Sequence, residues 1–413
     1  MVESKIQKYE DAVIRTTINN SKNINYIVGN KNVTTKPLTP YDSIICEFLN
    51  RLSLNILKNK IAKKYPDIIT FAYWCRKSNI NKLKKVFNDG KLRLGLGLAF
   101  HIAPSNVPIN FAYTFVFGLL AGNSNIVRLP SKEFPQINII CNEIKKIFKI
   151  KKFDEIKEMT AFVKYDHNDK ISSEFSKKCN VRIIWGGNET IRKIRQFALS
   201  ERAIDITFAD RYSFCLINSN SIIKLSQREM KVLALNFYND TYLMDQNACS
   251  SPHLIIWHGK NKIKAKKKFW DSVNTVIEEK YDLMDVSVID KYSLLMNDFI
   301  NKKNIKNFKI YNNNIYLINL NKLSKDIHTY RGKWGYFYEY DINNLNEIAG
   351  IINSKFQTLT YFGFKKSILS NFIKIKRFSG IDRIVPIGKA LDIQTIWDGY
   401  DIEKTLSRII DIQ

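Results

Sequence analysis

The segment from Leu94 to Val127 contains no Asp, Glu, Lys or Arg, although charged residues make up 25% of the chain. A stretch of this length without charge must either cross a membrane or be buried in a protein core. Its most apolar run, 109–121, is shorter than the roughly 20 residues that a membrane-spanning helix needs, and Pro104 and Pro108 precede it. We therefore expect a buried core and no membrane span.

The residues around this segment alternate between strand-like and helix-like patterns. Residues 92–103 have strand character, and 109–121 predict a buried helix that ends at Gly122 and Asn123. The other predicted strands are 125–129, 181–185, 214–217 and 254–257, and the other predicted helices are 133–149, 189–199, 227–238 and 261–280. This alternation predicts an α/β fold with mostly parallel sheets.

The amino-terminal part begins with polar residues 1–36, which we expect to form a peripheral arm. The first clear helix start is Thr39-Pro40-Tyr41-Asp42. Thr is a good N-cap, Pro suits the first helical position and an acid suits the third. We therefore predict that Thr39 caps a helix.

The chain is strongly basic, with 65 Lys and Arg against 39 Asp and Glu and a formal charge of +26. Such a charge suits an anionic partner, which could be a nucleic acid, a membrane surface, a phosphorylated cofactor or an acidic protein. A genome biased toward Lys, Asn, Ile, Tyr and Phe codons is the alternative explanation. No nucleic-acid-binding motif is evident, and we expect the lysines of 261–268 to form a solvated helix face.

The cysteines are scattered, with no CxxC pair and no Cys/His cluster, which argues against a zinc site and a disulfide framework. They are Cys46, Cys75, Cys141, Cys179, Cys215 and Cys249. The amino terminus lacks the apolar region of a signal peptide. We expect reduced thiols, no metal and a cytoplasmic location.

Two polar positions stand out beside the charge-free segment. Pro104-Ser105-Asn106-Val107-Pro108 holds Asn106 between a predicted strand and a predicted helix. A carboxamide fixed there could donate to a developing oxyanion, although it could equally be an ordinary helix cap. Arg128 ends a predicted strand, where open α/β sheets bind ligands, and could hold a ribose or phosphate or simply be a surface residue.

Two further segments could serve chemistry. Gly186 and Gly187 lie between a strand and a helix, where a backbone can approach a nucleotide closely, although this is not a GxGxxG motif and a plain tight turn is an alternative. Cys249 is the only cysteine set among small residues on a predicted loop, Asp245-Gln246-Asn247-Ala248-Cys249-Ser250-Ser251-Pro252. A nucleophilic thiolate needs such access, whereas most cysteines are buried and inert.

The histidines near Cys249 could indicate a Cys–His hydrolase. His253 and His258 lie on one predicted strand, and their five-residue offset places them on opposite faces. We interpret both as structural residues. His101, in the apolar run, is expected to be a hydrogen-bonded core histidine.

Taken together, several segments resemble, in this order, the long-chain acyl-CoA reductases of bacterial luminescence systems, a branch of the aldehyde dehydrogenase superfamily. They read SNVP, GNSNIVR, WGGNETIR, DQNACSSP and GIDRIVPIGKALDIQTIWDGY, from about Leu94 to Tyr400. The resemblance implies an aldehyde dehydrogenase-like α/β fold. Two doubly wound domains, one cofactor-binding and one catalytic, would have the active site between them.

The resemblance also implies an approximate division of the chain. The amino-terminal helical or arm region, packing on the cofactor domain, would be 1–90, the dinucleotide-binding domain 91–211, the catalytic domain 212–375 and a carboxyl-terminal return segment 376–413.

Roles follow from the resemblance residue by residue. Cys249 matches the nucleophile that takes the acyl group as a thioester, and Asn106 matches the amide donor of the oxyanion hole, which the Cys249 backbone N–H would complete. Arg128 matches a contact to the adenosine ribose or its 2′-phosphate, and the two glycines match the turn beneath the pyrophosphate and nicotinamide. The residues assigned to the cofactor are Pro104, Ser105, Arg128, Gly186 and Gly187.

Two departures from aldehyde dehydrogenases matter. The Glu that activates water in the oxidising enzymes falls near Thr207, although Asp210 could be a displaced base. Without that base, hydrolysis of an acyl-enzyme should be slow, which favours reduction. The Glu that usually holds the nicotinamide ribose falls on Gly332 or Lys333.

The expected function is NADPH-dependent reduction of a fatty acyl thioester, from acyl-CoA or an acyl-protein, to the aldehyde. The alternatives are an NAD(P)-dependent aldehyde dehydrogenase working oxidatively, a cysteine hydrolase, or a basic binding module. We expect a homo-oligomer, with an acyl-protein synthetase as a candidate partner and no nucleic acid. The acyl group itself stays open.

Overall fold

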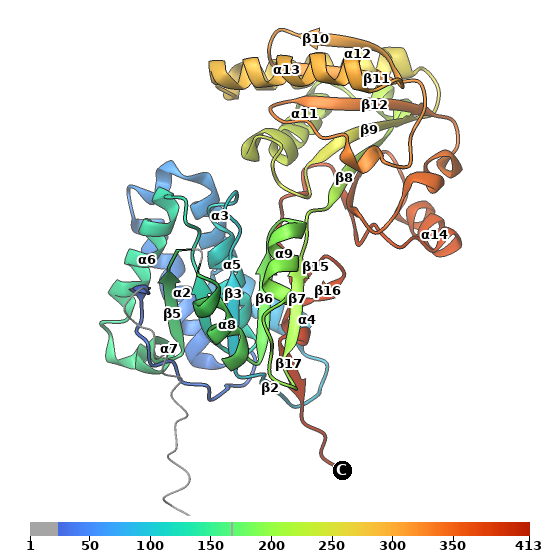
Figure 1. The fold of residues 1–413 in the computed structure, drawn as a ribbon. Helices are drawn as coiled ribbons and strands as arrows, with labels where there is room; N and C mark the ends of the chain where they lie inside the picture. The colour runs from blue at the N-terminus through green and yellow to red at the C-terminus, as the bar shows by residue number, and fades with distance from the viewer. Residues whose placement is uncertain (1–23, 167) are drawn as a thin grey trace, which may run out of the picture. The chain divides into compact units, whose positions relative to one another are not determined.

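The computed structural model describes residues 24–166 and 168–413 (Figure 1). The chain divides into two compact units, which are described separately below. The first comprises the described residues up to Ala209 together with Tyr400–Gln413, and the second comprises Asp210–Gly399. The second division falls inside the expected return segment 376–413, so each unit holds part of that segment.

The first unit is built on a six-stranded sheet in the order β1-β5-β4-β3-β6-β7. All neighbours are parallel except β1, which pairs antiparallel with β5. The strands are β1 (Asn25–Val28), β5 (Thr160–Lys164), β4 (Ser124–Arg128), β3 (Leu98–Ile102), β6 (Val181–Trp185) and β7 (Ile204–Phe208). After β3, the chain adds β4 and β5 on one side of it and then returns to add β6 and β7 on the other side. The direction of winding therefore reverses between β3 and β6.

Helices cover both faces of this sheet. On one face, apolar residues of α8 (Asp169–Lys178) and α9 (Asn188–Arg195) share a core with residues of β3, β4, β5 and β6. On the other, α5 (Asn110–Leu120) is buried along its whole length, which explains why this segment carries no charge. The remaining elements are α2 (Ser43–Lys58), α3 (Pro66–Trp74), α4 (Lys77–Phe87), α6 (Pro135–Ile147), α7 (Asp154–Glu158), α15 (Ile402–Thr405), β2 (Arg93–Gly95), β16 (Tyr400–Asp401) and β17 (Ser407–Ile409). In the described part of the chain, no helix combines the length and apolar character needed to cross a membrane.

Two local predictions need correction. The predicted N-cap Thr39 is wrong, because α2 is capped by Asp42, whose Oδ1 accepts from the backbone N–H of Ile44 at 3.0 Å. Tyr41 has a φ of 56°, outside the helical region, so the helix cannot begin before it. The predicted strand 92–103 is two strands, β2 and β3, separated at Gly97, which has a φ of 127°.

The second unit is built on a seven-stranded sheet in the order β10-β11-β12-β9-β8-β13-β14, which is parallel from β11 to β14. Only β10 is antiparallel to its neighbour. The strands are β10 (Ile305–Tyr311), β11 (Ile315–Leu320), β12 (Tyr336–Ile342), β9 (Pro252–His258), β8 (Tyr212–Asn218), β13 (Phe356–Phe362) and β14 (Arg383–Pro386). The short β15 (Ile396–Trp397) lies outside this sheet.

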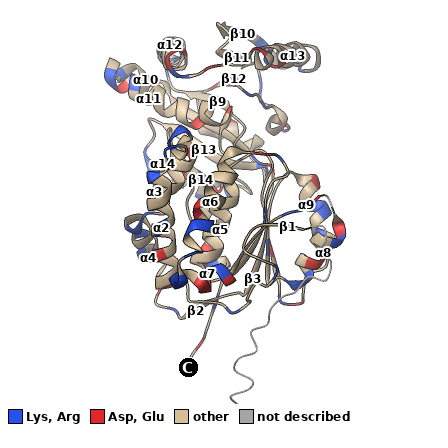
Figure 2. Ribbon diagram, turned by 90° about the vertical axis from the view of Figure 1, so that its left-hand side faces the viewer, with Lys and Arg blue, Asp and Glu red and all other residues tan. Residues whose placement is uncertain are grey.

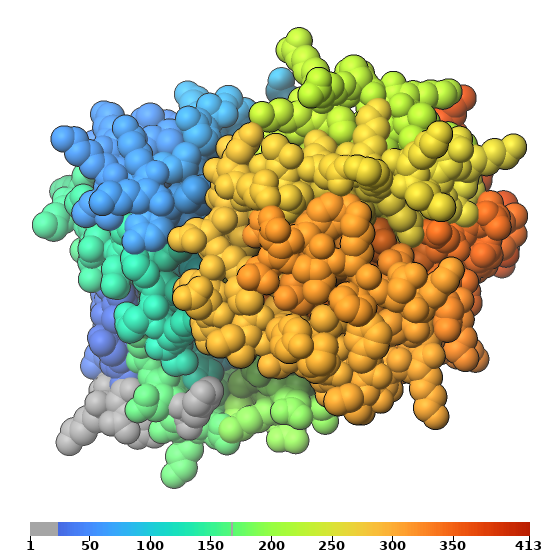
Figure 3. All heavy atoms as spheres, turned by 90° about the horizontal axis from the view of Figure 1, so that it is seen from above, coloured from blue at the N-terminus to red at the C-terminus, as the bar shows by residue number. Residues whose placement is uncertain are grey.

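Helices also cover both faces of the second sheet. One face packs against α10 (Ser219–Lys224), α11 (Gln227–Thr241) and α12 (Lys262–Lys280). The other packs against α13 (Asp285–Asn301) and α14 (Lys366–Lys376). Figure 3 shows a face of this unit formed by segments in the yellow to orange range of the colour bar. Both sheets are therefore doubly wound, as the resemblance implies.

Lys and Arg are spread over many helices of both units, including α8, α9 and α14 (Figure 2). The lysines of 261–268 lie at the start of α12, and Lys264 and Lys267 are exposed. Lys262, Lys266 and Lys268 are half-buried, and Lys266 pairs with Asp341 at 2.8 Å, so the expected solvated helix face is confirmed only for Lys264 and Lys267.

Candidate functional site

The carboxyl-terminal edge of the first sheet gathers three of the predicted segments. Ile102 at the end of β3 pairs with Arg128 of β4 on one side and with Ile184 of β6 on the other. The segment after β3, which carries Asn106, therefore leaves the sheet beside the glycines after β6. The winding reverses between these two strands, and this is where open α/β sheets bind ligands.

Asn106 lies in a bend between β3 and α5, and its side chain is exposed, as is that of Ser105, while Pro104 is half-buried. The N-cap of α5 is Ile109. Asn106 is therefore not the cap of this helix, which removes the ordinary explanation for an Asn before a helix. Its carboxamide is available to a ligand.

The glycine turn after β6 is open. A Cβ on Gly187 would meet nothing within 4 Å, and one on Gly186 would meet Thr190 no closer than 3.4 Å. Gly187 has an extended backbone, with φ −65° and ψ 159°, that any residue can adopt. Neither the backbone nor the local packing therefore requires glycine here. The free space at the start of α9 would let a ligand approach the backbone closely.

Arg128 contacts an aromatic ring at the end of its strand. It ends β4 half-exposed, and its guanidinium lies 4.6 Å from the centroid of the Tyr165 ring. A stacked guanidinium keeps its N–H donors free in the plane of the group. The arrangement places a positive charge at the carboxyl-terminal edge of the first sheet.

Sequence reasoning missed an aromatic pair at the same edge. The rings of Trp185 and Phe208, the last residues of β6 and β7, are stacked with centroids 3.6 Å apart and planes at 14°. The indole N–H of Trp185 also donates to Thr114 Oγ1 at 3.2 Å. Beside this pair, Thr207 on β7 pairs with Ile184 of β6, so the position expected for a water-activating Glu carries a hydroxyl.

The remaining predicted residues lie at the opposite kind of edge, the amino-terminal edge of the parallel strands in the second unit. Cys249 lies just before β9, and Asp210 lies just before β8. Gly332 and Lys333 come just before β12. Because neighbouring parallel strands begin at the same edge, these residues are brought to one end of the sheet.

The loop that carries Cys249 is held by a buried glutamine. The Nε2 of Gln246 donates to the carbonyls of Pro252 and Tyr336 at 3.0 and 3.1 Å, and its Oε1 accepts from the backbone N–H groups of Gly335 and Tyr336, both at 3.2 Å. The residue is 1% exposed and has a φ of 61°. Four bonds from one side chain therefore tie the loop to the starts of β9 and β12.

Cys249 is half-exposed. Its carbonyl oxygen accepts from Ser213 Oγ at 2.6 Å, and its Sγ accepts from Gln357 Nε2 at 3.3 Å. Burial and the carboxylate of Asp398 raise the pKa of the Cys249 thiol to about 11, while the Gln357 hydrogen bond acts in the opposite direction. Cys46 is the other half-exposed cysteine, and the remaining four are buried.

A network of charged residues surrounds this thiol and was not found from the sequence. Gln357 Nε2 also donates to Asp398 Oδ1 at 2.6 Å. Asp398 lies 3.5 Å from Arg211 Nη1, and Arg211 Nη2 lies 2.6 Å from Asp382. The motif WDGY, which contains Asp398, carried part of the resemblance, but nothing in its residues indicated a partner more than 40 positions away.

Asp210 and the position expected for a nicotinamide-ribose Glu have clear surroundings. Asp210 is exposed and forms an ion pair with Arg331 at 2.9 Å. Gly332 is buried, and a Cβ there would collide with the carbonyl oxygen and the Cβ of Tyr336. A Glu at 332 is therefore incompatible with this turn, while Lys333 is exposed.

The histidines near Cys249 differ in burial. His253 is 4% exposed and its ring stacks on Tyr212 with centroids 5.6 Å apart. Burial and the positive charge of Arg331 lower the pKa of His253 to about 3, so it stays neutral. His258 is half-exposed. Within residues 24–166 and 168–413, no group of three or more His, Cys, Asp or Glu side chains is placed to hold a metal ion.

His101 confirms the expectation of a satisfied core histidine. It is fully buried, its Nδ1 lies 2.8 Å from Thr114 Oγ1, and its Nε2 lies 2.9 Å from Asn125 Oδ1. Burial lowers its pKa to about 4. His101 therefore orders the core beneath the carboxyl edge.

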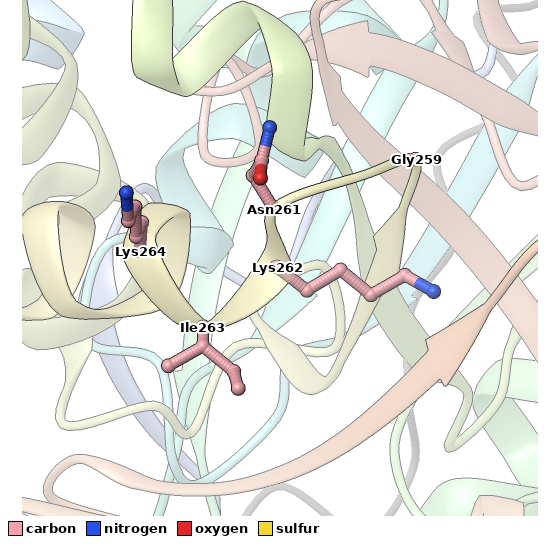
Figure 4. A pocket seen from close by; sticks show the side chains of 5 residues that line it. All are labelled: Gly259, Asn261, Lys262, Ile263 and Lys264. Atoms are coloured by element: carbon pink, nitrogen blue, oxygen red, sulfur yellow. The ribbon is translucent and has the colours of Figure 1, made fainter.

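A surface hollow lies at the start of α12, far along the sheet from Cys249. Gly259 follows the carboxyl end of β9, whereas Cys249 precedes its amino end. Figure 4 shows that the side chains around the hollow point in different directions and do not converge. The lining residues are Gly259, Asn261, Lys262, Ile263 and Lys264. Nothing in their arrangement resembles a catalytic site.

Comparison with known proteins gives a consistent picture. A family model described as acyl-CoA reductase (LuxC) matches residues 38–284. No curated protein matches the chain.

Solved structures with similar folds are distant in sequence. An NAD-dependent benzaldehyde dehydrogenase from Corynebacterium glutamicum is 10% identical with a TM-score of 0.60, covering 96% of this chain and 97% of that one. Aldehyde dehydrogenase 21 from Physcomitrella patens is 9% identical with a TM-score of 0.60, covering 89% and 85%. Proline utilization A from Bdellovibrio bacteriovorus is 12% identical with a TM-score of 0.62, covering 98% and 50%. These likenesses show an aldehyde dehydrogenase fold.

Proposed function

Because the chain belongs to the LuxC family of acyl-CoA reductases, we propose that it reduces a fatty acyl thioester to the aldehyde with NADPH, through a thioester on Cys249. Membership of the family supports an oxidoreductase activity that involves an aldehyde. The observation that carries the finer proposal is Cys249 itself, a half-exposed thiol on a loop fixed by Gln246, with a hydrogen-bond donor on its sulfur.

In the first step, Cys249 loses its proton and its sulfur attacks the carbonyl carbon of the acyl thioester. A carbon–sulfur bond forms, the bond to the CoA sulfur breaks, and the departing thiolate takes up a proton. We assign Asn106 and the Cys249 backbone N–H as donors to the oxyanion, a type of interaction worth about 3–4 kcal/mol per donor. Covalent catalysis of this kind divides one difficult step into two easier ones.

The second step requires the cofactor, and the carboxyl edge of the first unit fits a dinucleotide. Gly187 leaves open space at a helix start, and Arg128 offers a positive charge suited to a 2′-phosphate, which supports NADPH over NADH. When bound, the reduced nicotinamide supplies a hydride to the acyl carbon. The resulting thiohemiacetal collapses on Cys249: the carbon–oxygen double bond re-forms, the carbon–sulfur bond breaks, and the electron pair returns to the sulfur.

The position expected for the water-activating Glu lacks a carboxylate, and this favours the reductive direction of the reaction. Thr207 cannot activate water as a carboxylate does, and Asp210 is engaged by Arg331. The acyl-enzyme should therefore persist until it is reduced. This favours thioester reduction over the oxidative aldehyde dehydrogenase and the hydrolase, for both of which water must attack the acyl-enzyme.

The test is a panel of acyl-CoA chain lengths with purified protein, with NADPH followed at 340 nm and aldehyde and free thiol quantified. We expect one NADPH consumed and one thiol released for each aldehyde formed. Thiol release without NADPH consumption would identify a hydrolase. No turnover with any acyl-CoA, but turnover with an acyl-protein, would move the proposal to the protein-bound donor and an acyl-protein synthetase partner.

A further inference from the structure

Gln357 makes a set of contacts that the reaction outlined above does not use. It is the second residue of β13 and is 1% exposed. Its Nε2 donates both to Cys249 Sγ at 3.3 Å and to Asp398 Oδ1 at 2.6 Å, and its Oε1 accepts from Thr358 Oγ1 at 3.2 Å. Every polar atom of this buried carboxamide therefore has a partner.

These partners decide which way the amide points. An ionised carboxylate can only accept hydrogen bonds, and a hydroxyl can donate. The NH₂ group of Gln357 must therefore face Asp398, and its oxygen must face Thr358. Since the NH₂ group has two hydrogens, one is directed to Asp398 and the other is free to point at the Cys249 sulfur.

Asp398 is itself held in place. Its side chain is 4% exposed and lies 3.5 Å from Arg211, which also pairs with Asp382 at 2.6 Å and donates to the carbonyl of Phe356. Burial raises the pKa of Asp398 to about 6, while Arg211 and the Gln357 hydrogen bond oppose the shift. The N–H that Gln357 donates to Asp398 Oδ1 favours the ionised form of this carboxylate.

We propose that Gln357, oriented by Asp398, is the donor that stabilises the Cys249 thiolate. The inference rests on the proposed function only in taking Cys249 as the nucleophile. A thiolate is present at two points: before the sulfur attacks the thioester, and after the thiohemiacetal collapses and the electron pair returns to the sulfur. The same N–H stabilises both, because hydrogen bonds to a charged acceptor are stronger than those to a neutral one.

The other charges near the thiol act without a hydrogen bond to it. The carboxylates of Asp398 and Asp210 oppose the thiolate, and Arg331 favours it. Burial lowers the pKa of Arg383, and a thiolate at Cys249 opposes that shift. Gln357 is the group that contacts the sulfur directly. Asp398 thus has two effects of opposite sign, because it positions the donor but also repels the negative sulfur.

The test measures alkylation of Cys249 by iodoacetamide in the full-length protein, without acyl-CoA or cofactor, from pH 7 to 11. Peptide mass spectrometry separates Cys249 from Cys46, the other half-exposed thiol. Gln357→Leu should slow Cys249 alkylation about tenfold at pH 8 and move its pH profile upward, because a donor to the thiolate is lost. Cys46 should react as in the parent, which reports an intact fold.

Three further variants sharpen the test. Thr360→Val removes a buried hydroxyl on the same strand, one that donates to the Phe214 carbonyl at 3.5 Å, and should leave Cys249 alkylation unchanged. Gln357→Glu keeps the shape but turns the donor into an acceptor, and should slow alkylation at least as much as the Leu variant. Asp398→Asn removes the repelling charge while keeping an acceptor for Gln357, and should speed alkylation several-fold.

An unchanged or faster Cys249 rate in Gln357→Leu overturns the proposal. A slower rate in Asp398→Asn contradicts only the expectation that repulsion by Asp398 outweighs its positioning of Gln357. Failure of the proposed function is distinguishable, because alkylation requires no substrate. If alkylation responds as expected but no acyl thioester is reduced, the donor assignment stands and the proposed reaction falls. If thioester reduction requires Cys249 but the Gln357 variants do not change its alkylation rate, the proposed reaction stands and the donor assignment falls.

Discussion

The carboxyl edge of the first sheet and the amino edge of the second are built in opposite ways. At the first, Gly187 faces open space and Asn106 is exposed. At the second, Gln246 and Gln357 are buried and each is bonded through both ends of its amide. A cofactor must enter and leave, so its edge needs room, whereas a covalent nucleophile must be held, so its edge needs rigid support.

The largest expected effect falls on the amino edge. Cys249→Ala should abolish thioester reduction, because no other group can carry the acyl intermediate. NADPH binding, measured by fluorescence titration, should stay near the parent value, since the cofactor is assigned to the other edge. Cys46→Ser is the matched control and should keep its activity. Near-normal turnover in Cys249→Ala would contradict the assignment of Cys249 as the nucleophile.

The contrast assigns cofactor binding to the first edge and chemistry to the second. Asn106 tests it, because this exposed residue lies at the first edge but is assigned to the oxyanion hole. Asn106→Ala should lower kcat about 10²–10³-fold. Thermal unfolding should hardly change, since Asn106 is exposed and does not cap α5. An unchanged kcat would take Asn106 out of the oxyanion hole and leave the open edge with binding alone.

Two glycines test the comparison as a matched pair. Gly187→Ala meets no atom within 4 Å and needs no unusual backbone angle, so stability should change by less than about 0.5 kcal/mol, while the KM for NADPH rises. Gly332→Ala collides with Tyr336 and should cost about 1–3 kcal/mol. The free energy of unfolding of both variants is measured by chemical denaturation, and their NADPH binding by titration. An equal loss of stability in the two variants would contradict the contrast between an open first edge and a tightly packed second edge.

The smallest effect concerns the net charge of +26. NADPH and CoA carry several phosphates, and a basic protein attracts them over a distance that salt shortens. The KM for acyl-CoA should therefore rise a few-fold between about 50 and 300 mM salt, with little change in kcat. A KM that does not change with salt would leave codon bias as the explanation of the net positive charge.

The segments with strong local patterns were predictable. The charge-free run indicated the buried helix α5, and strand 181–185 matches β6 residue for residue. The errors arose where backbone angles decide. Tyr41 takes a positive φ that ends the supposed first turn of α2, and Gly97 interrupts the long apolar run. Neither angle follows from residue type alone, because tertiary contacts select it.

Cys249, Asn106 and Arg128 were proposed from the sequence because each stands among residues that simple packing does not explain, and their roles were taken from the family resemblance. Gln357 was not found, because it lies within the apolar strand FQTLTYF and its partner Cys249 is 108 positions away. Only parallel pairing, which aligns the starts of β8, β9 and β13, brings them together. The sequence by itself determined the elements with strong local patterns, such as α5 and β6, and which thiol is set among small residues, since those depend on neighbours in the chain. The tertiary structure alone decided which groups touch that thiol, because hydrogen bonds act over about 3 Å between residues that the fold must first bring to the same edge.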